Sequence, residues 1–311
     1  MSACWSEEVL SRFPVRKTRA QKEAFRAFAS ERFASRGWRV AEETGGIARS
    51  VNLIVGDVAR AKIVFAAHYD TCAALPVPNF IAPSNWAATL LYQVALGVCL
   101  CVPAALVSAA VALLLRLPLV AGLAGCLCCA ALVALMLCGP ANRSNANDNT
   151  SGVCVLAETI LSLSPDTSVA FVFFDHEEWG LLGSSAFFKA HRAQMQDKPL
   201  LNFDCVSDGS HFLIARKKGW RRNAALDARL QEALRGLPEG KTARTAAAWT
   251  VIYPSDQAHF PCGAAVVALR RHPLLGHYLS RIHTRRDTRF DPVNIAALRE
   301  VCVRLCDSFS G

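Results

Sequence analysis

Two long apolar segments joined by almost no loop constrain this chain more than any other feature. Across residues 71–142 the only charged residue is Arg116. The apolar segments run over 86–115 and 117–138, and about 20 residues suffice to cross a hydrocarbon core about 30 Å thick. The second segment fits that length, whereas the first must tilt, kink at Pro103 or begin in the interface. The pattern predicts two transmembrane helices that form a hairpin.

An alternative interpretation is a hydrophobic helical pair buried inside a soluble fold. A helix that packs on the surface of a domain carries a polar stripe along its outer face. Neither apolar segment has such a stripe. The composition therefore favours a lipid bilayer as the surroundings of the hairpin.

The flanking residues indicate which side of the membrane the rest of the chain occupies. Basic residues are frequent on both flanks, the hairpin tip has only Arg116, and cytoplasmic flanks carry the positive excess. Residues 1–8 show no basic segment leading into an apolar core, so no cleavable signal peptide is visible. Six of the 13 cysteines lie in the apolar segments, and the others show no zinc-ribbon pair spacing or disulfide framework, which is typical of a reducing compartment. We expect an integral protein of the cell membrane with a cytoplasmic catalytic domain.

The net charge of +9 raises the question of a nucleic-acid partner. Basic clusters occur, for example Arg216-Lys217-Lys218, but no recognised nucleic-acid module accompanies them. Attraction to the anionic inner leaflet is the simpler explanation beside a membrane hairpin. We therefore expect a lipid bilayer and no nucleic acid as partner; the sequence does not determine the oligomeric state.

Outside the hairpin, strand-like apolar runs alternate with helical segments. This alternation predicts an α/β three-layer sandwich with a mostly parallel central sheet. The catalytic domain would be discontinuous, comprising residues 1–75 and 142–311, with the hairpin inserted at 76–141. The expected strands are 38–40, 51–55, 63–67, 168–174, 199–204, 250–253 and 264–269, and the expected helices are 15–36, 152–162, 181–192, 223–235 and 292–309.

Acidic residues and histidines follow the expected strands. In open α/β sheets the loops beyond the carboxyl ends of the strands build the active site. His68 and Asp70 follow one buried strand, the pair Glu177-Glu178 follows a second, and Asp204 follows a third. Imidazole and carboxylate groups are ligands of hydrolytic zinc and related divalent metals. The sequence therefore predicts a metal site at one edge of the sheet.

Spacing suggests different roles within this set. Asp70 lies on the same side as His68 and can accept its second imidazole proton, which fixes the tautomer. Because neighbouring residues of an extended chain point in different directions, one of Glu177 and Glu178 can bind a metal while the other reaches the attacking water. Asp148 lies before a predicted helix and could also serve as its N-cap.

The order of these motifs resembles the M28 family of zinc peptidases, aminopeptidases with two co-catalytic metals. The resemblance covers nearly all of the chain outside the hairpin. It implies peptide substrates, cleavage at free N-termini, and two Zn²⁺ ions, with Co²⁺ or Mn²⁺ as possible substitutes. The motifs are His68-Tyr69-Asp70, Asn147-Asp148-Asn149-Thr150-Ser151-Gly152, Glu177-Glu178-Trp179-Gly180, Asp204 and His283-Thr284.

The resemblance also implies a role for each residue. Asp148 would bridge the two metals. One metal would add His68 and Asp204, and the other would add Glu178 and His283. Glu177 would act as the general base, and Asp70 would support the site as the partner of an imidazole ligand.

This chain departs from the family pattern in three places. Typical members have about a dozen residues between the first two ligand motifs, where this chain has the hairpin. The usual Ser-Asp-His reads Ser255-Asp256-Gln257, and Ile282 replaces a tyrosine that precedes the last histidine in some relatives. Because the hairpin emerges between ligand motifs, we expect the active site near the bilayer and membrane-associated peptides as substrates.

Two other functions remain open. One is glutaminyl-peptide cyclisation, which related proteins perform with a single zinc. The other is a non-catalytic binding or scaffold protein on the same fold. The complete ligand set favours the dinuclear aminopeptidase over both.

Overall fold

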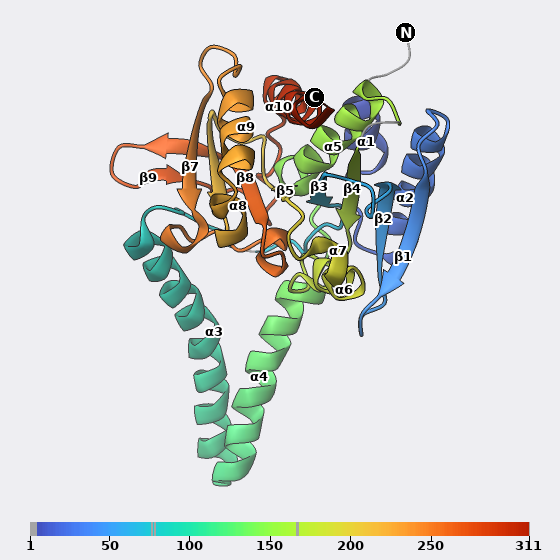
Figure 1. The fold of residues 1–311 in the computed structure, drawn as a ribbon. Helices are drawn as coiled ribbons and strands as arrows, with labels where there is room; N and C mark the ends of the chain where they lie inside the picture. The colour runs from blue at the N-terminus through green and yellow to red at the C-terminus, as the bar shows by residue number, and fades with distance from the viewer. Residues whose placement is uncertain (1–4, 76, 78, 166–167, 311) are drawn as a thin grey trace.

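A nine-stranded mixed sheet forms the centre of the domain outside the apolar hairpin (Figure 1). The computed structural model describes residues 5–75, 77, 79–165 and 168–310. The strand order is β1-β2-β4-β3-β5-β8-β6-β7, and β9 pairs with β8. The strands are β1 Val40–Gly45, β2 Ser50–Gly56, β3 Ile63–His68, β4 Val169–Phe174, β5 Leu200–Phe203, β6 His211–Arg216, β7 Thr242–Ala247, β8 Gly263–His272 and β9 Gly276–Tyr278.

The four central strands, β4, β3, β5 and β8, run parallel to one another. Strands β2 and β6 flank them in the antiparallel sense. The parallel centre places the carboxyl ends of β3, β4 and β5 at a common edge, which is the edge where the sequence places the expected ligands. The prediction of a mostly parallel central sheet is confirmed, with antiparallel pairs at the flanks.

Helices cover both faces of the sheet, so the prediction of a three-layer sandwich is also confirmed. Residues of α1, α2, α5, α9 and α10 pack on one face, and α6 and α7 pack on the other. The helices of the domain are α1 Trp5–Arg12, α2 Arg19–Ala34, α5 Gly152–Ser162, α6 Leu182–Ala190, α7 Arg192–Met195, α8 Lys218–Arg222, α9 Ala224–Leu234 and α10 Pro292–Ser310. Short helical turns occur at η1 Ala146–Ser151, η2 Ala248–Thr250 and η3 Asp256–His259.

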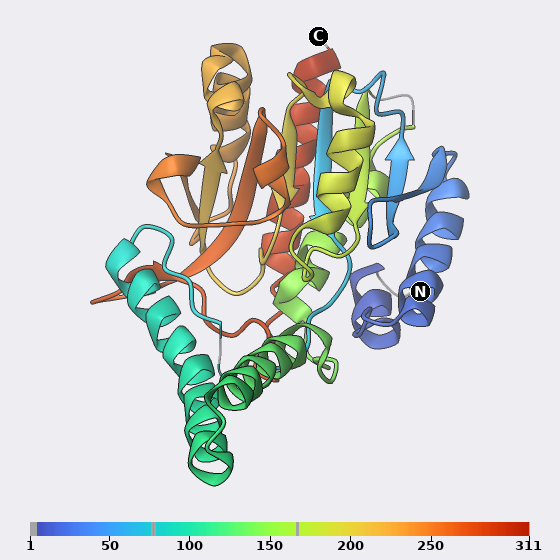
Figure 2. The ribbon, with the colours of Figure 1, turned by 90° about the horizontal axis from the view of Figure 1, so that it is seen from below.

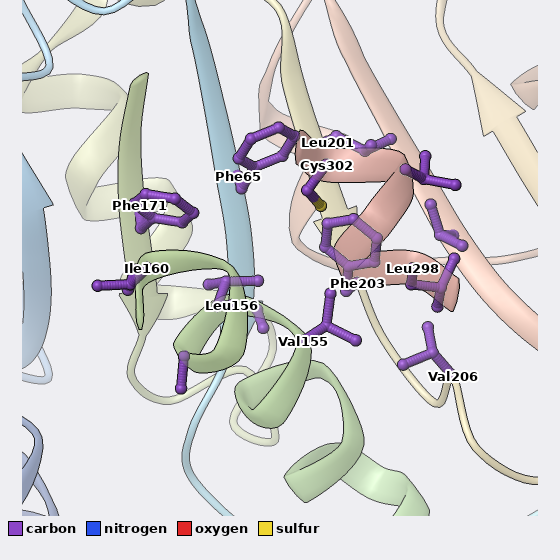
Figure 3. Close-up of a cluster of buried hydrophobic side chains, with 14 of the residues drawn as sticks. Phe65, Val155, Leu156, Ile160, Phe171, Leu201, Phe203, Val206, Leu298 and Cys302 are labelled. Carbon is purple, nitrogen blue, oxygen red and sulfur yellow. The ribbon is translucent and has the colours of Figure 1, made fainter. Parts of the chain in front are cut away.

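Strand β3 is buried along its whole length. Successive side chains point to opposite faces of the sheet and enter the hydrophobic core on each face, as expected for a central parallel strand. Phe65 packs against Phe171 with ring centroids 5.6 Å apart, and both lie near Leu156 of α5 (Figure 3). This packing anchors the strand that ends in His68.

The two apolar segments form helices α3 (Trp86–Leu115) and α4 (Pro118–Cys138), which project away from the domain and meet at the tip (Figures 1 and 2). Both are long and apolar enough to cross a membrane, and only 6% and 11% of their most apolar windows are buried. The alternative of a hairpin buried in a soluble core is therefore wrong. Within the hairpin, Gly125 lies against the α3 backbone at Ala104, whereas Gly122 faces open space.

Some sequence-based expectations differ from the structure. The strand expected at 250–253 is wrong. The amide of Ile252 donates to the Pro83 carbonyl and not to a neighbouring strand, and the Tyr253 hydroxyl donates to the Asp204 carbonyl. The strand expected at 38–40 begins only at Val40, since Trp38 is buried and its indole donates to the Ile160 carbonyl. Helices α1 and α8 and strands β6, β7 and β9 were not predicted.

The packing of β3 makes a testable prediction about stability. Phe65 is fully buried, so Phe65→Ala should lower the free energy of unfolding by about 3–5 kcal/mol through the lost burial and the cavity it leaves. Ile47 is fully exposed, and Ile47→Ala should change it by less than about 0.5 kcal/mol. Chemical denaturation in detergent measures both; similar losses in the two variants would contradict this assignment of the core.

Candidate metal centre

The expected ligands converge beyond the carboxyl ends of the central strands. His68 is the last residue of β3, Asp204 follows β5, and Glu177 and Glu178 lie in the loop after β4. Asp148 comes from η1, which begins shortly after α4 ends. The structure thus brings together side chains that are widely separated in the sequence, as the strand arrangement predicted.

Asp148 lies between two groups of side chains. Its Oδ1 is 3.3 Å from His68 Nε2, and that same nitrogen is 3.6 Å from Asp204 Oδ1. Its Oδ2 is 3.1 Å from His283 Nε2, which is 3.2 Å from Glu178 Oε2. Each oxygen of the Asp148 carboxylate therefore faces a different histidine–carboxylate pair.

Asp70 stabilises the Glu177-Glu178 loop as well as His68. Its Oδ1 accepts from the amide of Glu177 at 3.1 Å, and its Oδ2 accepts from the amide of Glu178 at 3.3 Å. His68 Nδ1 lies 3.2 Å from the main-chain oxygen of Asp70 and 3.5 Å from its Oδ1. Asp70 therefore joins the loops of β3 and β4 at the site.

The two asparagines on either side of Asp148 fix the loop that carries it. The Asn147 amide oxygen accepts from the backbone amides of Ser207 and Asp208. Asn149 Oδ1 accepts from Gly152 at the start of α5, and its Nδ2 donates to the Phe203 carbonyl. Asn149, not Asp148, thus satisfies an amide at the helix start.

Two further buried ionisable side chains support this arrangement. Asp287 accepts hydrogen bonds from the backbone amides of Asn147 and Asp148, both at 2.9 Å. Burial and the nearby Asp148 raise the pKa of Asp287 to about 8. Arg16 is fully buried and donates through Nε to the Tyr69 carbonyl at 2.5 Å. These contacts connect the N-terminal segment and the last loop to the ligand-bearing loops.

Burial and mutual charge shift the pKa values in this cluster strongly. Burial would lower the pKa of His283, but Glu178 and Asp148 raise it to about 9. Burial raises the pKa of Glu178 to about 8 although His283 opposes the shift. His68 likewise has a pKa well above its usual value, because nearby carboxylates, Glu177 first, outweigh its burial. The raised pKa values favour protonated imidazoles, whose positive charge would offset the buried carboxylates.

Sequence reasoning missed one residue at this centre and understated another. Cys72 Sγ lies within 4.8 Å of ligand atoms of Glu178 and His283; its position four residues after His68 was the available signal. Asp256, interpreted as structural, is fully buried near the charged groups of His68, Asp204 and Asp70. Burial raises the pKa of Asp256 to about 7. Cys205 is a buried core residue, as expected.

The side chains present fit a metal centre. Among the described residues, His68 Nε2 and Glu178 Oε1 are buried and have no hydrogen-bond partner. His68, Asp148 and Asp204 offer ligand atoms within 4.8 Å of one another. Nitrogen and carboxylate ligands at such spacing suit Zn²⁺, which compensates buried negative charge that protons otherwise offset.

Comparison with known proteins agrees with the fold and the motifs. The sequence profile of peptidase family M28 matches residues 135–305, more than half of the chain. This chain belongs to peptidase family M28. No curated protein matches it in sequence.

Solved structures similar to this chain include both peptidases and cyclases. Porphyromonas gingivalis glutaminyl cyclase has a TM-score of 0.59 and 17% identity, over 97% of this chain and 94% of that one. Legionella pneumophila LapA aminopeptidase has a TM-score of 0.57 and 13% identity, over 98% and 69%. A Zn-dependent exopeptidase from Parabacteroides distasonis has a TM-score of 0.56 and 14% identity, over 96% and 94%. At these identities the likeness shows the fold.

The protonated imidazoles predict a pH dependence of metal binding. Ligation requires neutral imidazoles. The pKa of His283 is about 9, and the pKa of His68 is well above its usual value, so Zn²⁺ must displace their protons. We expect zinc affinity to increase as pH rises from about 6 to about 9, with net proton release. Titration calorimetry in buffers of different ionisation enthalpy measures both; pH-independent affinity without proton release would contradict this ligand set.

Proposed function

We propose that this protein is a membrane-anchored, dinuclear zinc aminopeptidase. The observation that carries the proposal is the placement of Asp148, whose two carboxylate oxygens face separate histidine–carboxylate pairs. His68 and Asp204 would hold one zinc, and Glu178 and His283 would hold the other, with Asp148 shared. Membership of peptidase family M28 supports peptide hydrolysis, and the fold shared with LapA aminopeptidase supports action at the N-terminus.

Glu177 is the proposed general base. When bound, zinc supplies a Lewis acid that polarises the scissile carbonyl and acidifies a water molecule. Burial raises the pKa of Glu177 well above its usual value, and Glu178 and Asp204 add to this effect against the opposing charge of His68. A carboxylate of raised pKa can accept the proton of the attacking water and deliver it to the leaving amine.

Asp70 acts as a positioning residue in this proposal. Its carboxylate accepts hydrogen bonds from the backbone amides of Glu177 and Glu178, so it fixes the loop that carries the proposed base and one proposed ligand. It also lies against Nδ1 of His68 and leaves Nε2 directed toward Asp148. Orientation of this kind maintains ligand geometry.

The position preceding His283 supplies no donor to the reacting carbonyl. Ile282 is buried, and its apolar side chain packs in the cluster with Tyr253 and Leu279. A hydroxyl at this position could donate a hydrogen bond to a developing oxyanion. Carbonyl polarisation would therefore depend on the metals in this chain.

The second candidate is a single-zinc glutaminyl-peptide cyclase. The similarity to Porphyromonas gingivalis glutaminyl cyclase over nearly the whole length of both chains favours it. The presence of ligands for two metals favours the aminopeptidase. A non-catalytic scaffold is the least favoured function, because every proposed ligand and the proposed base are present in the chain.

Substitution of the base tests the proposal. Glu177→Gln should leave about two zinc ions per chain but reduce hydrolysis of amino-acid amides and unblocked peptides by at least about a hundredfold. Glu239→Gln, a change at an exposed glutamate, should retain full activity. Metal analysis and kcat/KM on free and blocked N-termini measure these effects.

Several results would contradict the aminopeptidase. Full turnover by the Glu177→Gln variant would exclude Glu177 as base. One zinc per chain together with cyclisation of N-terminal glutamine peptides would assign the cyclase. Metal-free, inactive protein from a zinc-replete preparation would assign the scaffold.

The hairpin is the proposed membrane anchor. Large apolar side chains are exposed along both helices, including Leu90, Leu91, Leu113, Leu119 and Leu127, and exposure to water of so much apolar area is unfavourable. Immersion in a bilayer removes this cost. The basic flanks of the hairpin support a cytoplasmic catalytic domain under the positive-inside rule.

The hairpin leaves and re-enters the domain beside the metal centre. Leu75, before α3, donates its amide to the His283 carbonyl at 2.7 Å. The chain after α4 enters η1, which carries Asp148. We therefore propose that the active site faces the membrane surface and acts on membrane-associated peptides.

Removal of the hairpin tests this placement. Replacement of residues 87–138 by a Gly-Ser linker retains the contacts of Ile81 and Trp86 with the domain. We expect a folded protein in the soluble fraction that cleaves soluble peptides normally but loses relative efficiency on vesicle-anchored peptides. Competition assays measure the ratio of kcat/KM values. An unchanged ratio would mean that the hairpin only tethers the protein and does not position the active site.

A further inference from the structure

A cavity of about 500 Å³ lies where α4 joins the domain. We call it the root cavity, and no part of the proposed hydrolysis uses it. Its lining combines small apolar residues with two arginines and a serine. The lining residues are Ala74, Pro140, Ala141, Arg143, Ser144 and Arg285.

Three segments distant in sequence are joined by hydrogen bonds to form the walls. The amide of Ala74 donates to the Pro140 carbonyl at 2.8 Å. Asn142 is fully buried; its amide donates to the Cys72 carbonyl, and its Nδ2 donates to the Thr284 carbonyl at 3.0 Å. The walls are therefore held by the fold and do not depend on mobile surface side chains.

The charge of the root cavity is positive and uncompensated. Arg143 and Arg285 are exposed, and in the described ranges neither has an ion-pair partner. The lining segments 72–75 and 140–145 contain no acidic residue, and Asp287, beyond Arg285, is buried against the Asp148 backbone. Two guanidinium groups at one cavity match the oxygens of a phosphate group.

The C-terminal end of α4 would by itself repel an anion, because the helix dipole is negative there. Lys17 counters this effect: its Nζ donates to the Leu137 carbonyl in the last turn of α4 at 2.7 Å. The neighbouring Arg286 is also exposed. Lys17 thus adds a third positive charge at the end of the helix that borders the root cavity.

The position of the root cavity along α4 indicates which phosphate-bearing molecule would reach it. Pro140 follows Gly139, the C-cap of α4, so the cavity lies where an inserted α4 leaves the hydrocarbon. Lipid headgroups occupy this level, and Ala74, Pro140 and Ala141 provide an apolar wall for the adjoining glycerol region. We propose that the root cavity binds the phosphate group of an anionic phospholipid. The inference depends on the proposed membrane anchor, not on the catalytic activity.

Lipid retention tests the proposal in the full-length protein. Wild-type protein is reconstituted in nanodiscs of phosphatidylcholine and phosphatidylglycerol, released in mild detergent and analysed by native mass spectrometry. We expect preferential retention of phosphatidylglycerol, reduced about tenfold or more by R143Q/R285Q. R221Q/R222Q removes two exposed charges on α8 and should retain the lipid. R143Q alone, which leaves the His283 loop intact, should show a partial loss.

Defined outcomes would overturn the site. Equal lipid retention by wild type and R143Q/R285Q would exclude the site, provided that thermal unfolding shows both proteins to be folded. A loss of lipid in R221Q/R222Q equal to that in R143Q/R285Q would also exclude it. Displacement of the lipid by inorganic phosphate at matched concentration would assign a soluble phosphate instead. Unchanged retention with a raised KM for acidic peptides would assign the arginines to substrate. Failure of the wild type to enter nanodiscs would refute the membrane anchor itself.

Discussion

The structure depends on the compensation of buried negative charge around Asp148. Carboxylates placed out of water are costly unless cations or hydrogen-bond donors face them. Here Asp148, Glu178 and Asp204 are opposed by His68 and His283, and Asp287 accepts backbone amides from the same loop. The cluster is consistent with a centre completed by divalent cations, whose charge replaces that of the imidazole protons.

The surrounding fold holds this cluster through backbone contacts. Asn147, Asn149 and Asp70 use their side chains to connect the loops after β3, β4 and β5. The candidate ligand side chains can therefore face one another, because other side chains hold the loops that carry them. The hairpin extends from this same group of loops, since Leu75 before α3 donates its amide to the His283 carbonyl and η1 with Asp148 follows α4 (Figure 1).

Much of the domain could be predicted from the sequence, because apolar periodicity is strong where burial is complete. β3 and β4 are uniformly buried runs and were located to within one residue, and α5 was located at its observed bounds. β7 was missed because its residues, Thr242–Ala247, are mostly exposed and lack an apolar pattern. The segment 250–253 has a strand-like composition, but tertiary contacts with Pro83 and Asp204 turn it into a loop.

The sequence by itself determined the family, the order of the ligand motifs and the apolar hairpin, because each is a local pattern of residue types. Only the tertiary structure decided which oxygen of Asp148 faces which histidine and that Cys72 and Asp256 lie at the centre. It also decided that Arg143 and Arg285 share one cavity. Such relations depend on the spatial arrangement of loops from different strands, and no periodicity in a single segment encodes that arrangement.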